Sequence, residues 1–280
     1  MHRDEYHPLY YRRCHSGHSD QALGAYILNW NEVPVILKDI SLIVGSEYIL
    51  DSLSIDFIPS RVTVLMGGSG CGKSTVLKAA AGLTPLSAGK VLYGDQSIYS
   101  LNQKEYAKMQ QNTGFMFQDG ALWANKNIIE NLSLPIIISD NSVKSESVEK
   151  MVMDGLKAFN MEFAKMIRPA ALSAGEKKII SFLRAVITDP DILFLDEPTS
   201  FIDNRSSLKL IKNLFRFKKE GKTIIMVTHD LKLAKTLGDY IVFMNDRKIE
   251  LYDTVEACLE SDNELWRNFI EDRSSDSMDE

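Results

Sequence analysis

A glycine-rich segment of the chain has the residue types and spacing of a phosphate-binding loop. It reads Gly67-Gly68-Ser69-Gly70-Cys71-Gly72-Lys73-Ser74-Thr75. Glycines in such a loop let backbone N–H groups turn inward around an anion, while the lysine reaches the terminal phosphates and the Ser74 hydroxyl binds Mg²⁺. A flexible glycine turn is the alternative, but average composition gives a chance match a probability of only about 1%. The segment therefore predicts a nucleotide-binding site.

Two neighbouring acids and a histidine offer the side chains that nucleotide hydrolysis needs. Asp196 and Glu197 come directly after the apolar run 192–195, and His229 comes soon after the apolar run 223–227. From the end of a strand, Asp196 can reach Mg²⁺ on a bound nucleotide, and Glu197 can polarise an attacking water. A surface turn is the alternative, but burial of two adjacent carboxylates is costly and is seldom only structural.

The surrounding pattern explains how these residues could meet. A strand-like run, 62–66, precedes the glycine loop, and a helix-forming run, 76–81, follows it. Another helix is expected over 206–219. Strands that alternate with helices predict a mostly parallel sheet, and ligands of such sheets bind beyond the carboxyl ends of the strands. Lys73, Asp196 and His229 should therefore converge.

The rest of the chain predicts two additions to this sheet. Residues 36–58, which alternate apolar and polar over 50–57, and residues 91–93 are expected to form an antiparallel sheet. Over 148–159 the apolar spacing predicts a helix, after a break at Pro135 and the polar stretch 139–147. The methionines in this region (Met151, Met153, Met161 and Met166) are expected in the core, with a protein-docking groove as the alternative.

Composition bounds the class of protein. The chain has 280 residues, of which 25% are charged and 45% hydrophobic, as in ordinary soluble proteins. It has no run of about 18 apolar residues that could span a membrane. Its three cysteines indicate a reducing compartment rather than a disulfide framework. The net charge of −6 argues against nucleic acid as a partner.

We expect three parts along the chain. Residues 1–32 are predicted to be an N-terminal tail. Its histidines and Cys14 could bind a metal, but their spacing fits no known site, so a mobile tail is favoured. Residues 33–270 are predicted to form the catalytic domain, with a helical subdomain at about 119–170. Residues 271–280 are predicted to be an acidic tail.

A set of motifs in a fixed order makes about residues 35–270 similar to the ATP-binding cassette (ABC) ATPases. Gly67–Ser74 corresponds to the Walker A loop. The other motifs are the Q-loop at Gln118, the signature motif at Leu172–Glu176, Walker B at Ile192–Asp196 with the catalytic glutamate at Glu197, the D-loop at Ser200–Asp203 and the switch histidine at His229.

This resemblance implies a fold and a chemistry. The fold is an α/β P-loop NTPase of the ABC ATPase type, with a mostly parallel sheet core, an antiparallel β subdomain and an inserted helical subdomain. The cofactors implied are ATP and Mg²⁺. Glu197, His229 and Gln118 are the catalytic residues implied, and Ser74, Gln118 and Asp196 are the metal-binding residues implied.

The resemblance also implies a head-to-tail homodimer, with each ATP between two subunits. Ser173, Gly175 and Asp203 would then contact the ATP held by the other subunit, with Ser173 capping the helix that follows it. Taken singly, Gln118, Ser173 and His229 could be a loop amide, a helix cap and a structural histidine; in combination we favour the catalytic reading.

The sequence departs from the family pattern at two places. Ala174 stands where the signature motif usually has its first glycine. If this position needs a positive φ, the β-carbon costs about 1 kcal/mol, and hydrolysis should be weakened rather than abolished. The aromatic residue that stacks on adenine is also not evident, because Val44 falls near its position and Tyr48 comes a few residues later.

Within the family, some segments resemble the Mla/Mce-type phospholipid-transport ATPases. They are Met66-Gly67, Phe117–Trp123, Glu130–Pro135 and Trp266–Ile270. The resemblance implies a cytoplasmic protein on the inner face of the cytoplasmic membrane, bound to an integral-membrane permease and to an Mce-domain lipid-binding protein.

Other functions stay open at this point. A solute importer and a lipoprotein-release or efflux system are alternatives within the ABC family. A cassette protein acting on ribosomes or DNA is disfavoured, because the chain has one cassette, no long coiled-coil insertion and an acidic balance. A non-catalytic binding module is the least favoured, because the residues for hydrolysis are all present.

Overall fold

The computed structural model describes residues 29–140 and 142–276. Its strands are β1 (Val35–Val44), β2 (Glu47–Phe57), β3 (Val62–Gly67), β4 (Ala88–Tyr93), β5 (Gln96–Ser97), β6 (Thr113–Met116), β7 (Ile192–Asp196), β8 (Thr223–Val227), β9 (Tyr240–Asn245) and β10 (Lys248–Thr254). Its α-helices are α1 (Lys73–Ala80), α2 (Gln103–Gln111), α3 (Ile128–Ser139), α4 (Ser145–Ala158), α5 (Ala174–Val186), α6 (Asn204–Lys219), α7 (Leu231–Leu237), α8 (Val255–Glu260) and α9 (Glu264–Asp276).

The central layer is a six-stranded sheet in the order β10-β9-β3-β8-β7-β6. β9, β3, β8, β7 and β6 run parallel, and β10 pairs antiparallel with β9. The strands expected at 62–66, 192–195 and 223–227 are the neighbours β3, β7 and β8 of this sheet. The prediction of a mostly parallel sheet is therefore confirmed, and the carboxyl ends of its parallel strands lie along one edge.

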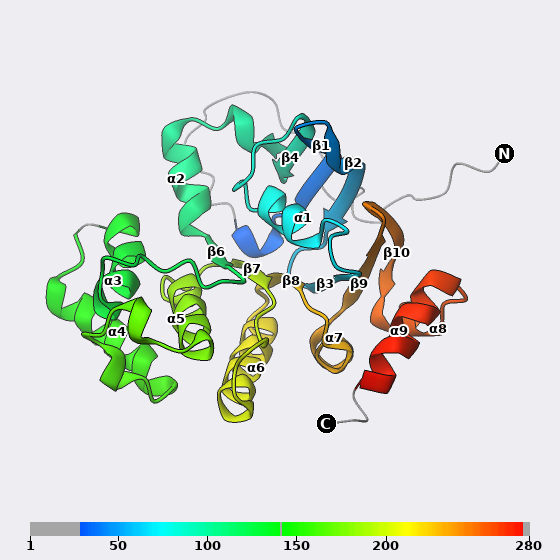
Figure 1. The fold of residues 1–280 in the computed structure, drawn as a ribbon. Helices are drawn as coiled ribbons and strands as arrows, with labels where there is room; N and C mark the ends of the chain where they lie inside the picture. Colours follow the sequence, from blue (N-terminus) through cyan, green and yellow to red (C-terminus); the bar gives the residue numbers. More distant parts are fainter. Residues whose placement is uncertain (1–28, 141, 277–280) are drawn as a thin grey trace.

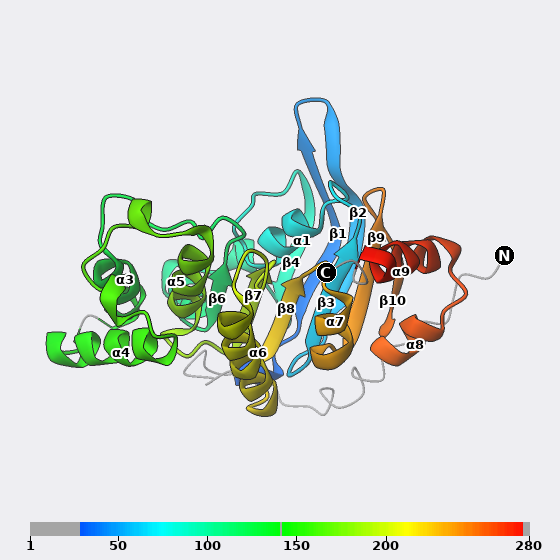
Figure 2. The same ribbon diagram turned by 60° about the horizontal axis from the view of Figure 1, so that its bottom comes forward.

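A second, antiparallel sheet has the order β2-β1-β4-β5. The β1–β2 hairpin turns at Gly45, which has a φ of 64°, and it extends beyond the rest of the molecule (Figure 2). The predicted antiparallel sheet is thus confirmed. The alternation over 50–57 is less regular than expected, because a register shift and a positive φ of 49° at Ser52 leave both Asp51 and Ser52 exposed.

The parallel sheet separates two hydrophobic cores. Along β7, Leu193 and Leu195 face the core under the helices α3–α9, while Ile192 and Phe194 face the core under α1 and the antiparallel sheet. This alternation is the period of two expected of strands, although both faces are apolar because both are covered. Since layers cover both faces, the neighbouring strands β7 and β8 carry polar side chains only at their ends, Asp196 and Thr223, and the candidate site lies at the carboxyl ends of these strands.

The helices α3, α4 and α5 lie together at one side of the sheet (Figure 1). The predicted apolar face of α4 is confirmed at Val148, Val152 and Leu156, which are buried. The expected break at Pro135 is wrong, because Pro135 lies inside α3. The capping box of Asn127 and Glu130 fixes the start of α3, and buried apolar residues on both sides of the proline keep the helix continuous.

The methionines of this region do not all enter the core, contrary to expectation. Met161 is buried, but Met151 and Met166 are 41% and 67% exposed. Met151 lies one position before the buried Val152, off the face of α4 that packs inward. The apolar surface near α4 is therefore larger than the sequence pattern predicted.

Regular structure extends beyond both bounds expected for the catalytic domain, residues 33 and 270. At the amino end, Trp30 lies in a 3₁₀ helix (Trp30–Glu32) and is buried in edge-to-face contact with Tyr93. The expected boundary at residue 271 lies inside α9. The histidines and Cys14 of the predicted tail are outside the described residues.

Trp266 anchors the C-terminal helix α9. Its ring is fully buried with the centroid 5.2 Å from that of Phe243, and Nε1 donates to the carbonyl oxygen of Cys258 at 2.6 Å. We expect Trp266→Ala to lower the free energy of unfolding by about 3–5 kcal/mol, because it removes the largest side chain of this contact and leaves a cavity in the core. Urea denaturation measures this. Leu265→Ala, at a 45% exposed neighbour, should change it far less; equal losses would contradict the role of Trp266.

Candidate active site

The glycine loop connects β3 to α1 and needs glycine at two positions. Gly67 has a φ of 145°, and a β-carbon there would lie 2.0 Å from the carbonyl oxygen of Met244. Gly72, with a φ of 99°, would bring a β-carbon to 2.9 Å from Leu50 Cδ2. Both contacts are too short for any side chain. The loop backbone is therefore packed between β9 and β2, at the amino end of α1 where an anion is favoured.

Lys73 is the first residue of α1, and its ammonium turns back into the glycine loop. Nζ donates to the carbonyl oxygens of Gly67 at 2.9 Å and Gly68 at 2.6 Å, and the side chain is buried. Among the residues that the structure describes, Lys73 forms no ion pair. Its other hydrogen-bond partner is the Cys71 Sγ at 3.6 Å, and a buried cation held by neutral groups is well suited to receive a phosphate.

Two oxygen groups that Mg²⁺ favours lie beside this loop. Ser74 Oγ donates to Asp196 Oδ1 at 3.0 Å. Burial raises the pKa of the Asp196 carboxyl, while the Ser74 hydrogen bond and nearby lysines, Lys73 among them, oppose the shift. Because Mg²⁺ is usually held by one or two protein oxygens together with phosphates and waters, Ser74 and Asp196 fit such an ion.

Glu197 follows Asp196 and pairs with the histidine of the next strand. His229 Nε2 lies 3.2 Å from Glu197 Oε1, and the two residues follow the adjacent strands β7 and β8. Burial raises the pKa of the Glu197 carboxyl; the hydrogen bond from the backbone N–H of His229 opposes the shift, and the neighbouring Asp196 adds to it. A carboxylate with a raised pKa is a better proton acceptor, as a general base requires.

The strand order brings the remaining expected residue to the same edge. Gln118 lies in the turn after β6, and β6 pairs with β7. The strands β3, β8, β7 and β6 are consecutive neighbours, so Lys73, His229, Glu197 and Gln118 follow four adjacent strand ends. The expected convergence of Lys73, Asp196 and His229 is thus observed, and Gln118 is an exposed side chain beside them.

The signature residues lie in a different hollow. Ser173 is the N-cap of α5 and forms a capping box with Glu176, so the helix-cap role is present in this state. Ser173, Gly175 and Asp203 line a hollow of about 580 Å³ together with Phe201, and none of the residues lining it belongs to the glycine loop. Their separation from Lys73 within one chain agrees with a contact to the nucleotide of another subunit.

The backbone strain considered for Ala174 is absent, because this position does not have a positive φ. Ala174 has a negative φ and is the first residue of α5. Its methyl group therefore costs no backbone strain, and the expected weakening of hydrolysis loses its reason. The tight position is Gly175, where a β-carbon would lie 2.7 Å from the carbonyl oxygen of Phe201.

We expect Gly175→Ala to lower ATPase activity on the order of tenfold or more, because the added methyl pushes the signature helix away from the loop that holds Phe201 and Asp203. Steady-state ATPase assays measure this. Gly155→Ala is the matched control, since its new methyl would meet only Leu183 Cδ2 at 3.6 Å. A Gly175→Ala protein as active as the Gly155→Ala protein would contradict this reading of the contact.

The two candidates near the adenine position both lie in the β1–β2 hairpin. Val44 is 61% exposed and Tyr48 is 45% exposed. The carbonyl oxygen of Ile49, next to Tyr48, would lie 3.2 Å from a β-carbon at Gly72, so the hairpin borders the glycine loop. Both side chains are exposed, and Tyr48 is the one that directly precedes the residue in contact with the glycine loop.

One buried cation in this region was not expected. Lys178, on α5, is 3% exposed and donates to the carbonyl oxygen of Glu197. The only signal in the sequence was a lysine directly before the apolar pair Ile179-Ile180, on a helix whose apolar residues must face the core. Its partners come from a segment about twenty residues later, which the helical pattern alone does not indicate.

Fold and site together define a nucleotide hydrolase with a phosphate-binding loop between a buried parallel strand and a helix. A sequence profile of the ABC transporter family matches residues 50–200, and the chain belongs to that family.

Relatives and solved structures agree with this assignment. The methionine import ATP-binding protein MetN of Clostridium tetani is 30% identical over 79% of this chain and 69% of its own length. The intermembrane phospholipid transport ATP-binding protein MlaF of Haemophilus influenzae is 28% identical over 87% of this chain and 92% of its own length. The dimeric structure of the cassette MJ0796 bound to ADP and Pi has a TM-score of 0.73, with 28% identity over 79% of this chain and 98% of that one.

The predicted ABC ATPase fold and the predicted enzyme class are therefore confirmed. The chain is the ATPase subunit of an ABC transporter, with ATP as its nucleotide and Mg²⁺ as its cofactor. ABC cassettes of this kind dimerise and work with membrane permease subunits. The two relatives named above are similarly identical to this chain but are named for different transported substrates, so family membership alone does not identify the substrate.

Proposed function

We propose that this ABC ATPase drives a phospholipid transporter of the Mla/Mce type. In this proposal two copies close around two ATP molecules, and hydrolysis reopens the dimer and moves an integral-membrane permease. The permease holds the ATPase on the inner face of the cytoplasmic membrane, and an Mce-domain protein handles the lipid. Within residues 29–140 and 142–276, no helix combines the length and apolar character needed to cross a bilayer.

The segment between Phe117 and Pro135 carries the lipid assignment. Its sequence resembles the phospholipid-transport group, and the MlaF relative aligns over 87% of this chain. The buried Asn131 organises the segment: its Oδ1 accepts from the backbone N–H of Trp123 at 2.8 Å, and its Nδ2 donates to the carbonyl oxygen of Asn127 at 2.9 Å. The Trp123 side chain, 50% exposed, is thereby presented on the surface near the Q-loop.

The geometry of the chain's own side chains supports the catalytic roles in this proposal. Lys73 and the glycine loop hold the phosphates, and Glu197 accepts a proton from the attacking water while His229 orients it. Ser74, Asp196 and Gln118 would hold Mg²⁺, which neutralises phosphate charge when bound.

Ser173, Gly175 and Asp203 would act on the ATP of the second copy. They line one hollow, away from the glycine loop of their own chain. A second chain would therefore be needed to bring them to a nucleotide.

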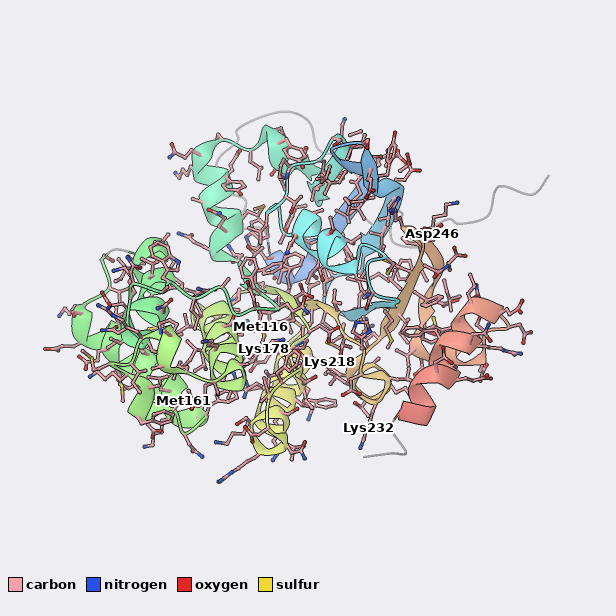
Figure 3. All side chains as sticks on the ribbon, viewed as in Figure 1. Met116, Met161, Lys178, Lys218, Lys232 and Asp246 are labelled. Carbon is pink, nitrogen blue, oxygen red and sulfur yellow. The ribbon has the colours of Figure 1, made fainter. Side chains whose placement is uncertain are left out.

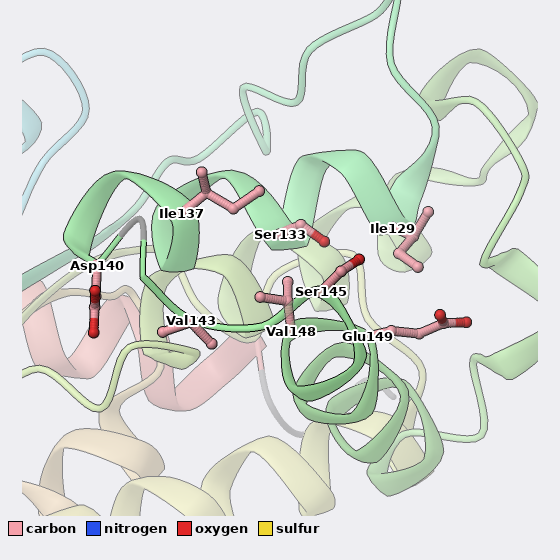
Figure 4. Close-up of a pocket in the computed structure, with 8 residues that line it drawn as sticks. All are labelled: Ile129, Ser133, Ile137, Asp140, Val143, Ser145, Val148 and Glu149. Atoms are coloured by element: carbon pink, nitrogen blue, oxygen red, sulfur yellow. The ribbon is translucent and has the colours of Figure 1, made fainter.

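The helical subdomain offers a surface on which the permease could dock. A pocket of about 250 Å³ lies between α3 and α4, and Ile129, Val143 and Val148 supply apolar side chains to its wall (Figure 4). Ile137 also lines the pocket, and the neighbouring Ile138 is 73% exposed. An apolar surface of this kind fits a short helix of a partner better than it fits water.

Affinity capture of the tagged protein from native membranes tests the proposal. Recovery of a permease and an Mce-domain protein with bound phospholipid, and ATP-dependent lipid transfer by the reconstituted complex, is the expected result. The same complex with Glu197→Gln is the control and should bind lipid without turning over. Recovery of a permease with a solute-binding protein, and no Mce-domain protein or lipid, would replace the lipid assignment with a solute importer.

A further inference from the structure

The backbone of Glu197 adopts a conformation that needs support. Its φ is 51°, in the left-handed region that non-glycine residues seldom occupy, and the residue is buried at the end of β7. Such a conformation persists only where surrounding contacts over-determine it, and it is found most often at functional sites. The direction of the Glu197 side chain depends on this φ. The contacts that fix the backbone therefore also fix the carboxylate relative to His229.

Hydrogen bonds hold both backbone groups of Glu197. Its N–H donates to the carbonyl oxygen of Val227 at 2.9 Å, which ties it to β8. Its carbonyl oxygen accepts from Ser200 Oγ at 3.0 Å and from Lys178 Nζ. Lys178 Nζ also donates to Ser200 Oγ at 2.6 Å, so the lysine and the serine form a closed set with that carbonyl. Lys178 is the only charged donor of the set.

Burial of the Lys178 ammonium costs desolvation free energy, which a purely structural contact would not need. Its side chain is 3% exposed, and among the described residues it forms no ion pair. It lies on α5, near the centre of the molecule in the view of Figure 3. A buried ammonium must be compensated by hydrogen bonds, whereas an apolar residue would fill the same space between α5 and β7 without that cost.

Lys178 also connects the signature helix α5 to the segment that follows β7, through its hydrogen bonds to Glu197 and Ser200. The helix begins at the cap of Ser173, five positions earlier, and Gly175 packs against the Phe201 carbonyl one residue beyond Ser200. A shift of the signature end of α5 would therefore reach the Glu197 backbone through the Lys178 ammonium.

We propose that Lys178 is a positioning residue that holds the Glu197 backbone in its left-handed conformation and couples the signature helix to the catalytic carboxylate. The proposal rests on the proposed role of Glu197 as general base. Lys178 itself acts on the backbone of Glu197 and does not act on the nucleotide.

Lys178→Met tests the proposal, because methionine keeps an apolar chain of similar length and removes every donor. We expect kcat for ATP to fall about ten- to hundredfold, since the base is displaced, while KM changes less than about threefold. Amide hydrogen exchange of residues 197–201 in the nucleotide-free protein should become faster. Lys178→Arg, which keeps charge and donors, should recover part of kcat. Lys177→Met, on the same helix and not buried, should leave all these values unchanged.

The outcomes separate this proposal from the proposed function. If Lys178→Met keeps the parental kcat and exchange rates while Glu197→Gln is inactive, the positioning role is overturned and the base assignment stands. A lower melting temperature with unchanged kcat would show a merely structural lysine and would also overturn it. If Lys178→Met does not fold, Lys178→Gln, which replaces the ammonium with a shorter neutral amide, is measured by the same readouts and must show the same selective loss of kcat.

Discussion

Glu197→Gln is expected to lower ATP turnover by about 10²–10⁴-fold while ATP still binds. The change removes the proton acceptor next to His229 Nε2 but keeps the shape of a buried side chain at the end of β7. Burial raises the pKa of the Glu197 carboxyl, which makes its carboxylate a better proton acceptor. The amide of the glutamine that replaces it cannot accept the proton. Steady-state phosphate release measures the rate, and equilibrium titration with a fluorescent ATP analogue measures binding.

The matched control is Glu220→Gln. Glu220 lies at the C-terminal end of α6, and its side chain forms an exposed ion pair with Arg216, which contributes little to stability. Its ATPase activity should equal that of the parent. If Glu197→Gln hydrolyses ATP at the parental rate, Glu197 is not the base and the catalytic assignment is wrong.

Lys73→Ala should lower ATPase activity on the order of 10²–10³-fold, and it should also weaken binding of Mg-ATP. The substitution removes the buried ammonium that turns into the glycine loop. Binding weakens because the ammonium attracts the phosphates of bound ATP, and the rate falls because the ammonium also stabilises the phosphate charge in the transition state. Measurement of kcat, KM and the dissociation constant for ATP separates the two contributions.

Lys104→Ala, at an exposed position in the first turn of α2, is the control for a lost positive charge. It should bind and hydrolyse ATP as the parent does. Unchanged ATP affinity of Lys73→Ala would mean that the glycine loop does not hold the phosphates, whatever happens to the rate.

The convergence of the catalytic side chains could be predicted because strand ends are visible in sequence. Short apolar runs lead to Lys73, Asp196 and His229, and parallel strands place such ends on one edge. The buried face of α4 was predictable for the same reason, since Val148 and Val152 are four residues apart. Local periodicity determines which face of α4 is buried, whereas the convergence was predicted from strand ends and from the rule that parallel strands end at one edge.

The errors arise where a residue's neighbours are distant in sequence or where context overrides preference. Pro135 usually ends a helix, but the capping box at Asn127 and packing on both sides keep α3 intact. The strain expected at Ala174 depended on a φ that sequence does not reveal. Lys178 and its partners Glu197 and Ser200 lie on different elements, so no local pattern could indicate their contact.

Measurement of the solution mass of Glu197→Gln tests the central claim, that two copies of this chain share each ATP. Multi-angle light scattering with ATP and Mg²⁺ should give the mass of two chains, and the same protein without nucleotide should give the mass of one. The double variant Glu197→Gln/Gly175→Ala should dimerise less at equal ATP. A single-chain mass in a sample that demonstrably binds Mg-ATP would contradict the account.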